Sequence, residues 1–324
     1  MTFARAQLDE ILHRLFIDAP ATSLRDEDRR KSDEMAGLLA EVAGAVARRS
    51  TRSELVLVDA AAGKAYVGLL AAELILAPRG QPARVRMIER EPARVAACHD
   101  AIARLRAPSR VGSQPALPPR GLRDGQPTPP PLRASRAPSP AADHRGRAWR
   151  GRAKRAGGGG GWGAEGQSEP SQGSHIGSVA VEVVTADVAD PAAWPMEPDL
   201  VVALHACGPA SDVIIDQSLA VQARTLLLVP CCTSKDVPSA ALAQLRAEQL
   251  GLPRHAEVRR RFIQSIVDAE RTLRLEAAGW QTTVVSFVAP TVTPHNLLWR
   301  AERVGEPGRM AEAVDRLARL RGNG

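Results

Sequence analysis

The sequence predicts an α/β fold built on a doubly wound, mostly parallel, seven-stranded sheet, with helices before it and one long disordered insertion within it. Along most of the chain, short apolar runs alternate with stretches of helical periodicity, which is typical of parallel strands joined by helices. The run Leu55–Val58 is continuously apolar, as expected of a strand buried on both faces. Residues 107–178 contain 14 Gly and 11 Pro, a composition that buries too little apolar surface to offset the entropy of ordering.

Two helices are expected before the first strand. Apolar residues recur at helical spacing from Leu8 to Phe16 and from Met35 to Val46. Ser32 is a candidate N-cap for the second of these helices, with Asp33 and Glu34 in its first turn.

The sheet and its connecting helices are expected in the following order. Strands are predicted at 55–58, 85–88, 179–184, 200–204, 225–229, 281–288 and 297–301. Helices are predicted at 66–77, from Pro92 onward, and at 213–219, 240–250, 262–273 and 310–320. The last two strands are joined by a short connection, so we expect them to be antiparallel.

The net charge of +7, from 43 Lys and Arg against 36 Asp and Glu, resides in one segment. Residues 107–178 hold 11 basic and 4 acidic residues, so the rest of the chain is neutral and no basic globular face is implied. The expected organisation is N-terminal helices (1–50), an α/β domain (51–106 and 179–303), the insertion (107–178) and a C-terminal helix (304–324). Two Arg-Gly-Arg motifs in the insertion are of a kind that contacts RNA, although a solvated insertion without a specific partner is the simpler interpretation.

Several classes of protein are excluded. The longest apolar run, 67–77, is eleven residues long and contains Glu73, whereas a bilayer span needs about 20 residues. The N-terminus lacks the apolar stretch of a signal peptide. Four cysteines are too few and too unevenly spaced for a disulfide framework, so a reducing, cytoplasmic localisation is expected.

Small and acidic residues follow the first three predicted strands, at the edge where such sheets bind ligands. The loop from Asp59 to Tyr66 consists mainly of small residues, which let a ligand approach the backbone amides. Glu89 ends the second strand, where an acid can accept both hydroxyls of a ribose, and Asp187 follows the third, where it can accept from an adenine amino group. The alternative is that Asp59 caps a helix and Glu89 is a surface charge. Three alanines in place of glycines also make a dinucleotide site less favourable.

Two motifs then identify a family resemblance. One is His205-Ala206-Cys207-Gly208, after the fourth strand, and the other is Val229-Pro230-Cys231-Cys232, at the end of the fifth. With these motifs the chain resembles class I S-adenosylmethionine-dependent methyltransferases, a Rossmann-like superfamily. Within it, the chain is similar to the group with a histidine–alanine–cysteine–glycine motif, which includes methyltransferase-like proteins and is related to tRNA 2′-O-methyltransferases. The resemblance covers about 30–106 and 179–302.

This resemblance implies S-adenosylmethionine as the cofactor and gives each strand end a role. Asp59, Ala61 and Gly63 would lie along the methionine part, Glu89 at the ribose, and Asp187 with Val188 at the adenine, with His205 also beside the cofactor. Ala61 and Ala65 occupy places that the family usually fills with glycine, so their methyl groups would crowd the cofactor.

The resemblance places the methyl acceptor next to the fourth strand, where His205, Cys207 and Asp212 are the catalytic candidates. His205 is a candidate general base, and Asp212 would either orient it or cap the next helix. The alternative is that His205 and Cys207 only pack against the cofactor.

Residues further along the chain are weaker candidates for the acceptor side. They are Cys231, Cys232, His295 and Asn296. A zinc site of the cysteines with His205 is conceivable, but adjacent cysteines in a strand point to opposite faces, so no metal is predicted.

The predicted function is methyl transfer from S-adenosylmethionine to an unidentified acceptor, with RNA as a candidate. Six arginines between 254 and 274, including Arg259–Arg261, favour phosphate contacts, although a solvated helix face explains them nearly as well. The alternative from another class is a non-catalytic module that binds RNA or protein. An NAD-dependent oxidoreductase is disfavoured by the missing glycines. The sequence gives no indication of the oligomeric state.

Overall fold

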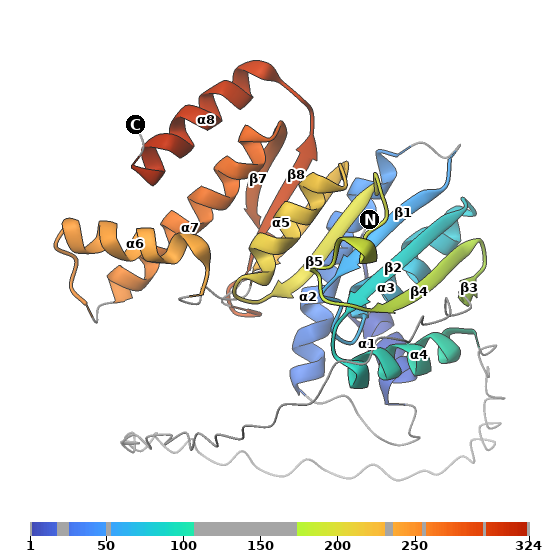
Figure 1. The fold of residues 1–324 in the computed structure, drawn as a ribbon. Helices are drawn as coiled ribbons and strands as arrows, with labels where there is room; N and C mark the ends of the chain where they lie inside the picture. The colour runs from blue at the N-terminus through green and yellow to red at the C-terminus, as the bar shows by residue number, and fades with distance from the viewer. Residues whose placement is uncertain are drawn as a thin grey trace, which may run out of the picture. The chain divides into compact units, whose positions relative to one another are not determined.

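The computed structural model describes residues 2–17, 26–49, 53–106, 174–230, 236–254, 257–293 and 296–322 (Figure 1). Its α-helices are α1 (Arg5–Phe16), α2 (Asp26–Ala47), α3 (Tyr66–Ala71), α4 (Pro92–Arg106), α5 (Ala210–Ala220), α6 (Pro238–Gln249), α7 (Glu257–Ala277) and α8 (Pro307–Arg321). A short π-helix, η1 (Ala72–Leu76), and a 3₁₀-helix, η2 (Ala77–Arg79), continue α3. A second 3₁₀-helix is η3 (Pro191–Ala193). The strands are β1 (Leu55–Ala60), β2 (Ala83–Glu89), β3 (Ser174–Ile176), β4 (Val179–Thr185), β5 (Leu200–Ala206), β6 (Thr225–Pro230), β7 (Trp280–Ser286) and β8 (Leu297–Arg303).

The strands form one sheet in the order β3-β4-β2-β1-β5-β6-β8-β7. β4, β2, β1, β5 and β6 are parallel, which confirms the doubly wound α/β fold. β7 runs antiparallel to β8, as the short connection predicted, and β8 also runs antiparallel to β6.

The sheet has eight described strands, not the seven that we predicted. The additional strand, β3, pairs antiparallel with β4 through a two-residue turn in which Gly177 has a φ of 57°. It lies within the range 107–178 that we assigned to the insertion, so the α/β fold begins again at Ser174 rather than at 179. The remaining part of that range, 107–173, lies outside the described residues.

Alternating side chains of the strands build two cores, one on each face of the sheet. Leu57 of β1 and Val202 of β5 belong to the core beneath α1, α2, α3 and α4. Val58 of β1 and Val201 of β5 belong to the core beneath α5, together with Trp299 of β8. Figure 1 shows α5 in front of the sheet and α2 behind it. Each central strand is therefore buried on both faces, which explains its continuously apolar sequence.

The start of α2 differs from the prediction. The helix begins at Asp26, so Ser32 lies inside it and is not its N-cap. The stretch 26–31 consists entirely of charged residues, most of which have good helix propensity and extend the helix toward the N-terminus. Ser32 is fully buried and its hydroxyl donates to the carboxylate of Asp9, which ties α2 to α1.

The strand order reverses at β1, which creates the crevice where sheets of this type bind ligands. From β1 the chain passes to β2 and β4 on one side and returns to β5 on the other. β1 and β5 both extend further than predicted, so Asp59 and His205 are each the last residue but one of a strand and do not lie in loops. Among the described helices, none has both the length and the apolar character of a membrane span.

Candidate functional site

Asp59 connects β1 to the helix that follows. Its side chain is buried, and its Oδ2 accepts the backbone N–H of Gly68 in α3 at 2.8 Å. A Cβ atom at Gly68 would lie 3.1 Å from the same oxygen, so glycine allows this close approach. Burial raises the pKa of Asp59 to about 7; the hydrogen bond from Gly68 opposes the rise and the charge of Glu89 adds to it. Asp59 thus binds a backbone amide in the first turn of α3, which is the contact that the helix-capping alternative describes.

The loop after β1 has the backbone of a glycine-rich turn, although alanines occupy two of its three left-handed positions. Ala61, Gly63 and Ala65 have φ values of 57°, 60° and 59°, all in the left-handed region. An alanine costs about 1–2 kcal/mol in this conformation, whereas glycine adopts it freely. The alanines therefore stand at positions that favour glycine, in agreement with the sequence comparison of Ala61 and Ala65, and the turn keeps its shape at an energetic cost.

Glu89 is held in one orientation by two backbone amides. Its Oε2 accepts the N–H of Gly63 at 2.8 Å, and its Oε1 accepts the N–H of Glu91 at 2.9 Å. The residue is 5% exposed. A carboxylate offers about four acceptor positions, so each oxygen retains one for a ligand. Glu89 is therefore not the surface charge of the alternative interpretation, because it joins the β1 loop to the end of β2.

Asp187 and Val188 form the turn after β4. The Oδ1 atom of Asp187 accepts the backbone N–H of Ala189 at 2.9 Å, and its Oδ2 lies 3.4 Å from a guanidinium nitrogen of Arg90. Val188 is buried, and its carbonyl accepts the indole N–H of Trp194 at 3.0 Å. The adenine role predicted for these two residues stays a prediction, but their backbone is well anchored.

His205 sits at a break in the regular pairing of β5. The register between β5 and β6 shifts between Leu204 and Ala206, and His205 has a φ of 57°. Before the break, odd-numbered residues such as Ala203 face the core beneath α5; after it, Ala206 faces that core. The irregularity thus inverts the alternation and turns the His205 side chain toward α2. Non-glycine residues in this region cost on the order of 1–3 kcal/mol and cluster at functional sites.

One partner of the His205 side chain is a residue that the sequence analysis did not identify. Glu34 of α2 is buried, and its Oε2 lies 2.8 Å from Nε2 of His205 and 2.8 Å from Nζ of Lys31. Burial raises the pKa of Glu34, but the hydrogen bonds from His205 and Lys31 outweigh it and leave the pKa below its usual value. We had interpreted Glu34 as an acid in the first turn of a helix. The available signal was its position one turn before Leu38, in line with the buried face of α2.

The role predicted for Asp212 is wrong. Its buried carboxylate binds two arginines of α7, with Oδ2 2.7 Å from Arg271 and Oδ1 3.1 Å from Arg274. These ion pairs within the buried cluster make Asp212 an anchor between α5 and α7. The carboxylate beside His205 is that of Glu34 instead.

The same contacts correct the arginine cluster. Arg271 is fully buried, and Arg259 is 10% exposed at its side chain, where it binds Glu248 at 3.1 Å and the carbonyl of Leu252 at 3.1 Å. These arginines hold the helices together and are not free for phosphate. Two further members, Arg260 and Arg261, are exposed.

The remaining candidates are less well placed. Cys207 is disulfide-bonded, so a catalytic thiol there requires reduction of that bond. Asn296 donates from Nδ2 to the carbonyl of Val288 at 2.9 Å and thereby closes the connection between β7 and β8; its acceptor-side role stays a prediction. Cys231, Cys232 and His295 lie outside the described residues. Within the described part of the chain, no three or more His, Cys, Asp or Glu residues are arranged to hold a metal ion.

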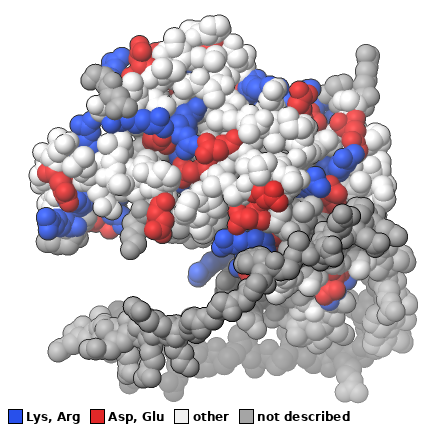
Figure 2. Space-filling model, viewed as in Figure 1, with Lys and Arg blue, Asp and Glu red and all other residues white. Residues whose placement is uncertain are grey.

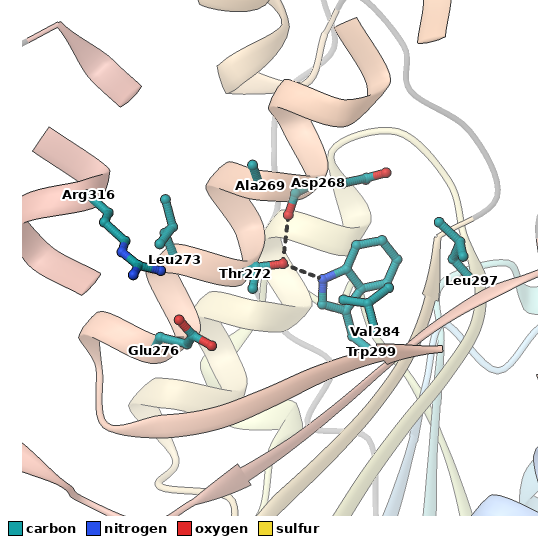
Figure 3. Close-up of a pocket in the computed structure, with 9 residues that line it drawn as sticks. All are labelled: Asp268, Ala269, Thr272, Leu273, Glu276, Val284, Leu297, Trp299 and Arg316. Atoms are coloured by element: carbon teal, nitrogen blue, oxygen red, sulfur yellow. Dashed lines mark hydrogen bonds between the residues drawn. The ribbon is translucent and has the colours of Figure 1, made fainter. Parts of the chain in front are cut away.

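The distribution of surface charge and one cavity complete the description. In Figure 2, Lys and Arg side chains are interspersed with Asp and Glu over the visible face, with no extended basic patch. A cavity of about 480 Å³ lies between α7, α8 and the β7–β8 hairpin, and it contains none of the predicted site residues. Figure 3 shows two hydrogen bonds among its lining residues: the indole N–H of Trp299 donates to the hydroxyl of Thr272 at 3.0 Å, and that hydroxyl donates to the carbonyl of Asp268 at 2.8 Å.

Comparison with known proteins gives one family match. The model of the family described as "Methyltransferase domain" matches residues 30–236, which include most of α2 and all the strands from β1 to β6. No curated protein matches the chain significantly.

Among solved structures, magnesium protoporphyrin IX methyltransferase from Synechocystis PCC 6803 with bound SAH is similar at 12% identity and a TM-score of 0.39, over 93% of this chain and 97% of that one. The citrinin polyketide synthase CMeT domain is similar at 10% identity and a TM-score of 0.40, over 94% of this chain and 65% of that one. Likeness at this level says nothing about the substrate.

Proposed function

We propose, since the chain belongs to the methyltransferase-domain family, that it transfers a methyl group from S-adenosylmethionine to an acceptor bound at the carboxyl end of β5. The observation that carries the proposal is the pair of polar side chains that flank β1 at the reversal of strand order. Glu89 ends β2 on one side, and His205 lies in β5 on the other.

The residues at this edge fit the cofactor. S-adenosylmethionine presents two ribose hydroxyls, and the two oxygens of Glu89 each retain an acceptor position after binding Gly63 and Glu91. The left-handed backbone at Ala61 and Gly63 turns the chain sharply beside that carboxylate. Asp59 precedes the same loop and accepts a hydrogen bond from Gly68 in the helix that follows it, so it connects the two ends of the loop. These residues would hold the nucleoside end of the cofactor, with Asp187 and Val188 toward the adenine.

When bound, S-adenosylmethionine would supply an electrophilic methyl group; the acceptor's lone pair would form the new bond to carbon, and the electrons of the carbon–sulfur bond would remain on sulfur. The protein then has two tasks, to align the acceptor and to accept its proton. His205 is suited to the second task because a neutral imidazole has one ring nitrogen that can accept a proton.

Binding and turnover together test the proposal. Calorimetry with S-adenosylmethionine, S-adenosylhomocysteine and NAD should give heat with the first two only. His205→Ala should lower methyl transfer by roughly 10²–10⁴-fold while cofactor affinity changes little. A parallel fall in affinity and turnover would mean that His205 only packs against the cofactor. Binding without transfer to any cell fraction would favour a non-catalytic RNA- or protein-binding module.

RNA is the acceptor class that we propose to test first. Arg260 and Arg261 are exposed near the start of α7, although Glu257 pairs with both and offsets part of their charge. Radiolabelled methyl transfer to a whole-cell extract, separated into RNA, protein and small molecules, identifies the class directly. Label in RNA that falls on charge reversal of Arg260 and Arg261 supports this choice, and label only in the other fractions rejects it.

A further inference from the structure

We propose that Glu34 of α2 is a positioning residue for His205, which holds the imidazole in place and stabilises its protonated form. The inference rests on the proposed function, because it concerns the group that we assign as general base. It gives the N-terminal helices, which sequence analysis placed outside the α/β domain, a part in the chemistry.

The contact determines which imidazole nitrogen faces which partner. Oε2 of Glu34 lies 2.8 Å from Nε2 of His205, and the glutamate side chain is 9% exposed. An ionised carboxylate only accepts hydrogen bonds, so Nε2 of neutral His205 carries the proton. In this tautomer Nδ1 carries the lone pair, so a proton released by the methyl acceptor would go to Nδ1.

The backbone supports a functional explanation of this contact. Without the register shift at His205, the alternation of β5 would send this side chain toward the core beneath α5, with Val201 and Ala203. The left-handed conformation of His205 is unfavourable, yet it is what brings the imidazole to Glu34. A histidine that only filled space would have no need of this conformation.

Glu34 itself is firmly held. Lys31, one turn earlier in α2, donates to the same Oε2 at 2.8 Å. α2 is fixed against α1 by the hydrogen bond from Ser32 to Asp9 and by the ion pair of Arg5 with Asp33 at 3.2 Å. Among the described residues, the charged and titratable groups that contact this carboxylate are Lys31 from α2 and His205 from β5, and both favour its ionised form.

The proton movement balances as follows. As the acceptor atom gains the methyl group, it gives its proton to Nδ1 of His205, and Nε2–H remains hydrogen-bonded to Glu34. The imidazolium carries one positive charge, which lies against the negative charge of Glu34 until the proton passes from Nδ1 to solvent. Carboxylate–histidine pairs act in this way in enzymes that use histidine as a base.

The test uses the full chain with Glu34→Gln, which keeps the shape of the side chain and removes its charge. The matched control is Glu41→Gln. Glu41 lies two turns further along α2 and accepts from Arg300 at 2.6 Å, so its replacement removes a carboxylate from the same helix without altering the contact to His205.

One readout does not depend on activity. With ¹⁵N-labelled histidine, NMR should show a downfield imidazole N–H resonance that is assigned to His205 by its absence in His205→Ala. The resonance should persist in Glu41→Gln and move upfield in Glu34→Gln, because a neutral acceptor forms a weaker hydrogen bond. An unchanged resonance in Glu34→Gln overturns the contact on which the inference rests.

Turnover then tests the positioning role, with the extract fraction that takes up methyl label as acceptor. Glu34→Gln should lower kcat by about 10–100-fold with little change in KM, and it should have no further effect in a His205→Ala background. An unchanged kcat, or an equal loss in both backgrounds, overturns the proposal. S-adenosylhomocysteine affinity and the melting temperature show whether the variant is folded. If the wild-type chain binds no S-adenosylhomocysteine, the proposed function fails; if binding is normal and only the Glu34 effects are absent, this inference fails alone.

Discussion

Replacing Glu89 by alanine should weaken cofactor binding and also destabilise the fold, because one carboxylate serves both. Its two oxygens accept the backbone N–H groups of Gly63 and Glu91 at 2.8 and 2.9 Å. A buried donor left without a partner costs about 1–3 kcal/mol, whereas a donor that water reaches costs much less. Glu91 is exposed and Gly63 is partly exposed. The free energy of unfolding should therefore fall by about 1–2 kcal/mol, mostly through Gly63.

The effect on the cofactor follows from the acceptor positions that Glu89 retains. Hydrogen bonds to a charged group contribute about 1.5–3 kcal/mol, which corresponds to roughly a tenfold to 150-fold weaker Kd for S-adenosylhomocysteine in Glu89→Ala. Calorimetry measures this loss. An S-adenosylhomocysteine analogue without the 2′ and 3′ hydroxyls should bind the wild-type chain weakly and lose little more in Glu89→Ala, since the partner groups are already missing.

Two further variants make the test strict. Glu89→Gln offers one acceptor oxygen and one donor nitrogen, so it should keep one of the two backbone amides and show an intermediate loss of stability. Glu91→Gln is the control, because its side chain is exposed and pairs only with Arg94 at 2.7 Å among the contacts described. A loss of affinity below threefold in Glu89→Ala, or an equal loss for the cofactor and its deoxy analogue, refutes the ribose assignment.

Two other predictions concern Asp59 and Gly68, whose hydrogen bond connects β1 to α3. The pKa of Asp59 is raised from 3.8 to about 7, so the folded state holds this proton more tightly than the unfolded state, and its contribution to stability falls as pH rises from about 4 to 7. The difference in unfolding free energy between wild type and Asp59→Asn, measured in urea, should fall by up to about 1.4 kcal/mol per pH unit over that window, and a constant difference contradicts the assignment. Gly68→Ala should destabilise the chain by about 1–3 kcal/mol, because its Cβ would lie 2.8 Å from Met87. Gly308→Ala is the control: it meets nothing within 4 Å and should leave the thermal midpoint unchanged or slightly raised.

The sequence predicted the parts of the fold that depend on local pattern. Strands such as β1 and β5 were found because continuous apolar runs reflect burial on both faces. β3 was missed because a three-residue edge strand next to a long Gly- and Pro-rich range has no periodicity to detect. The start of α2 was misplaced because Ser32 resembles a cap in sequence, whereas in the structure its hydroxyl bonds to another helix.

The placement of Asp59 and Glu89 at one edge of the sheet was predictable, because both residues follow strand ends in chain order. Asp59 and Glu89 lie where parallel strands bring them to one edge of the sheet, and the position of the switch point follows from the strand order. Their hydrogen bonds to Gly68 and Gly63 were not predictable, since backbone amides carry no sequence signal.

The acceptor side depended on contacts that no local pattern encodes. His205 and Glu34 are 171 residues apart, and Asp212 and Arg271 are 59 apart. Sequence proximity suggested Asp212 as the partner of His205, and strand alternation would have agreed, since His205 would then have faced α5, the helix that carries Asp212. A single left-handed residue reverses that outcome: it turns His205 to the opposite face, where α2 supplies a carboxylate, and leaves Asp212 to two arginines of α7. One backbone conformation, that of His205, therefore decides which carboxylate lies beside the candidate general base. A series of variants at and around His205 in β5 is the most direct way to study the chemistry.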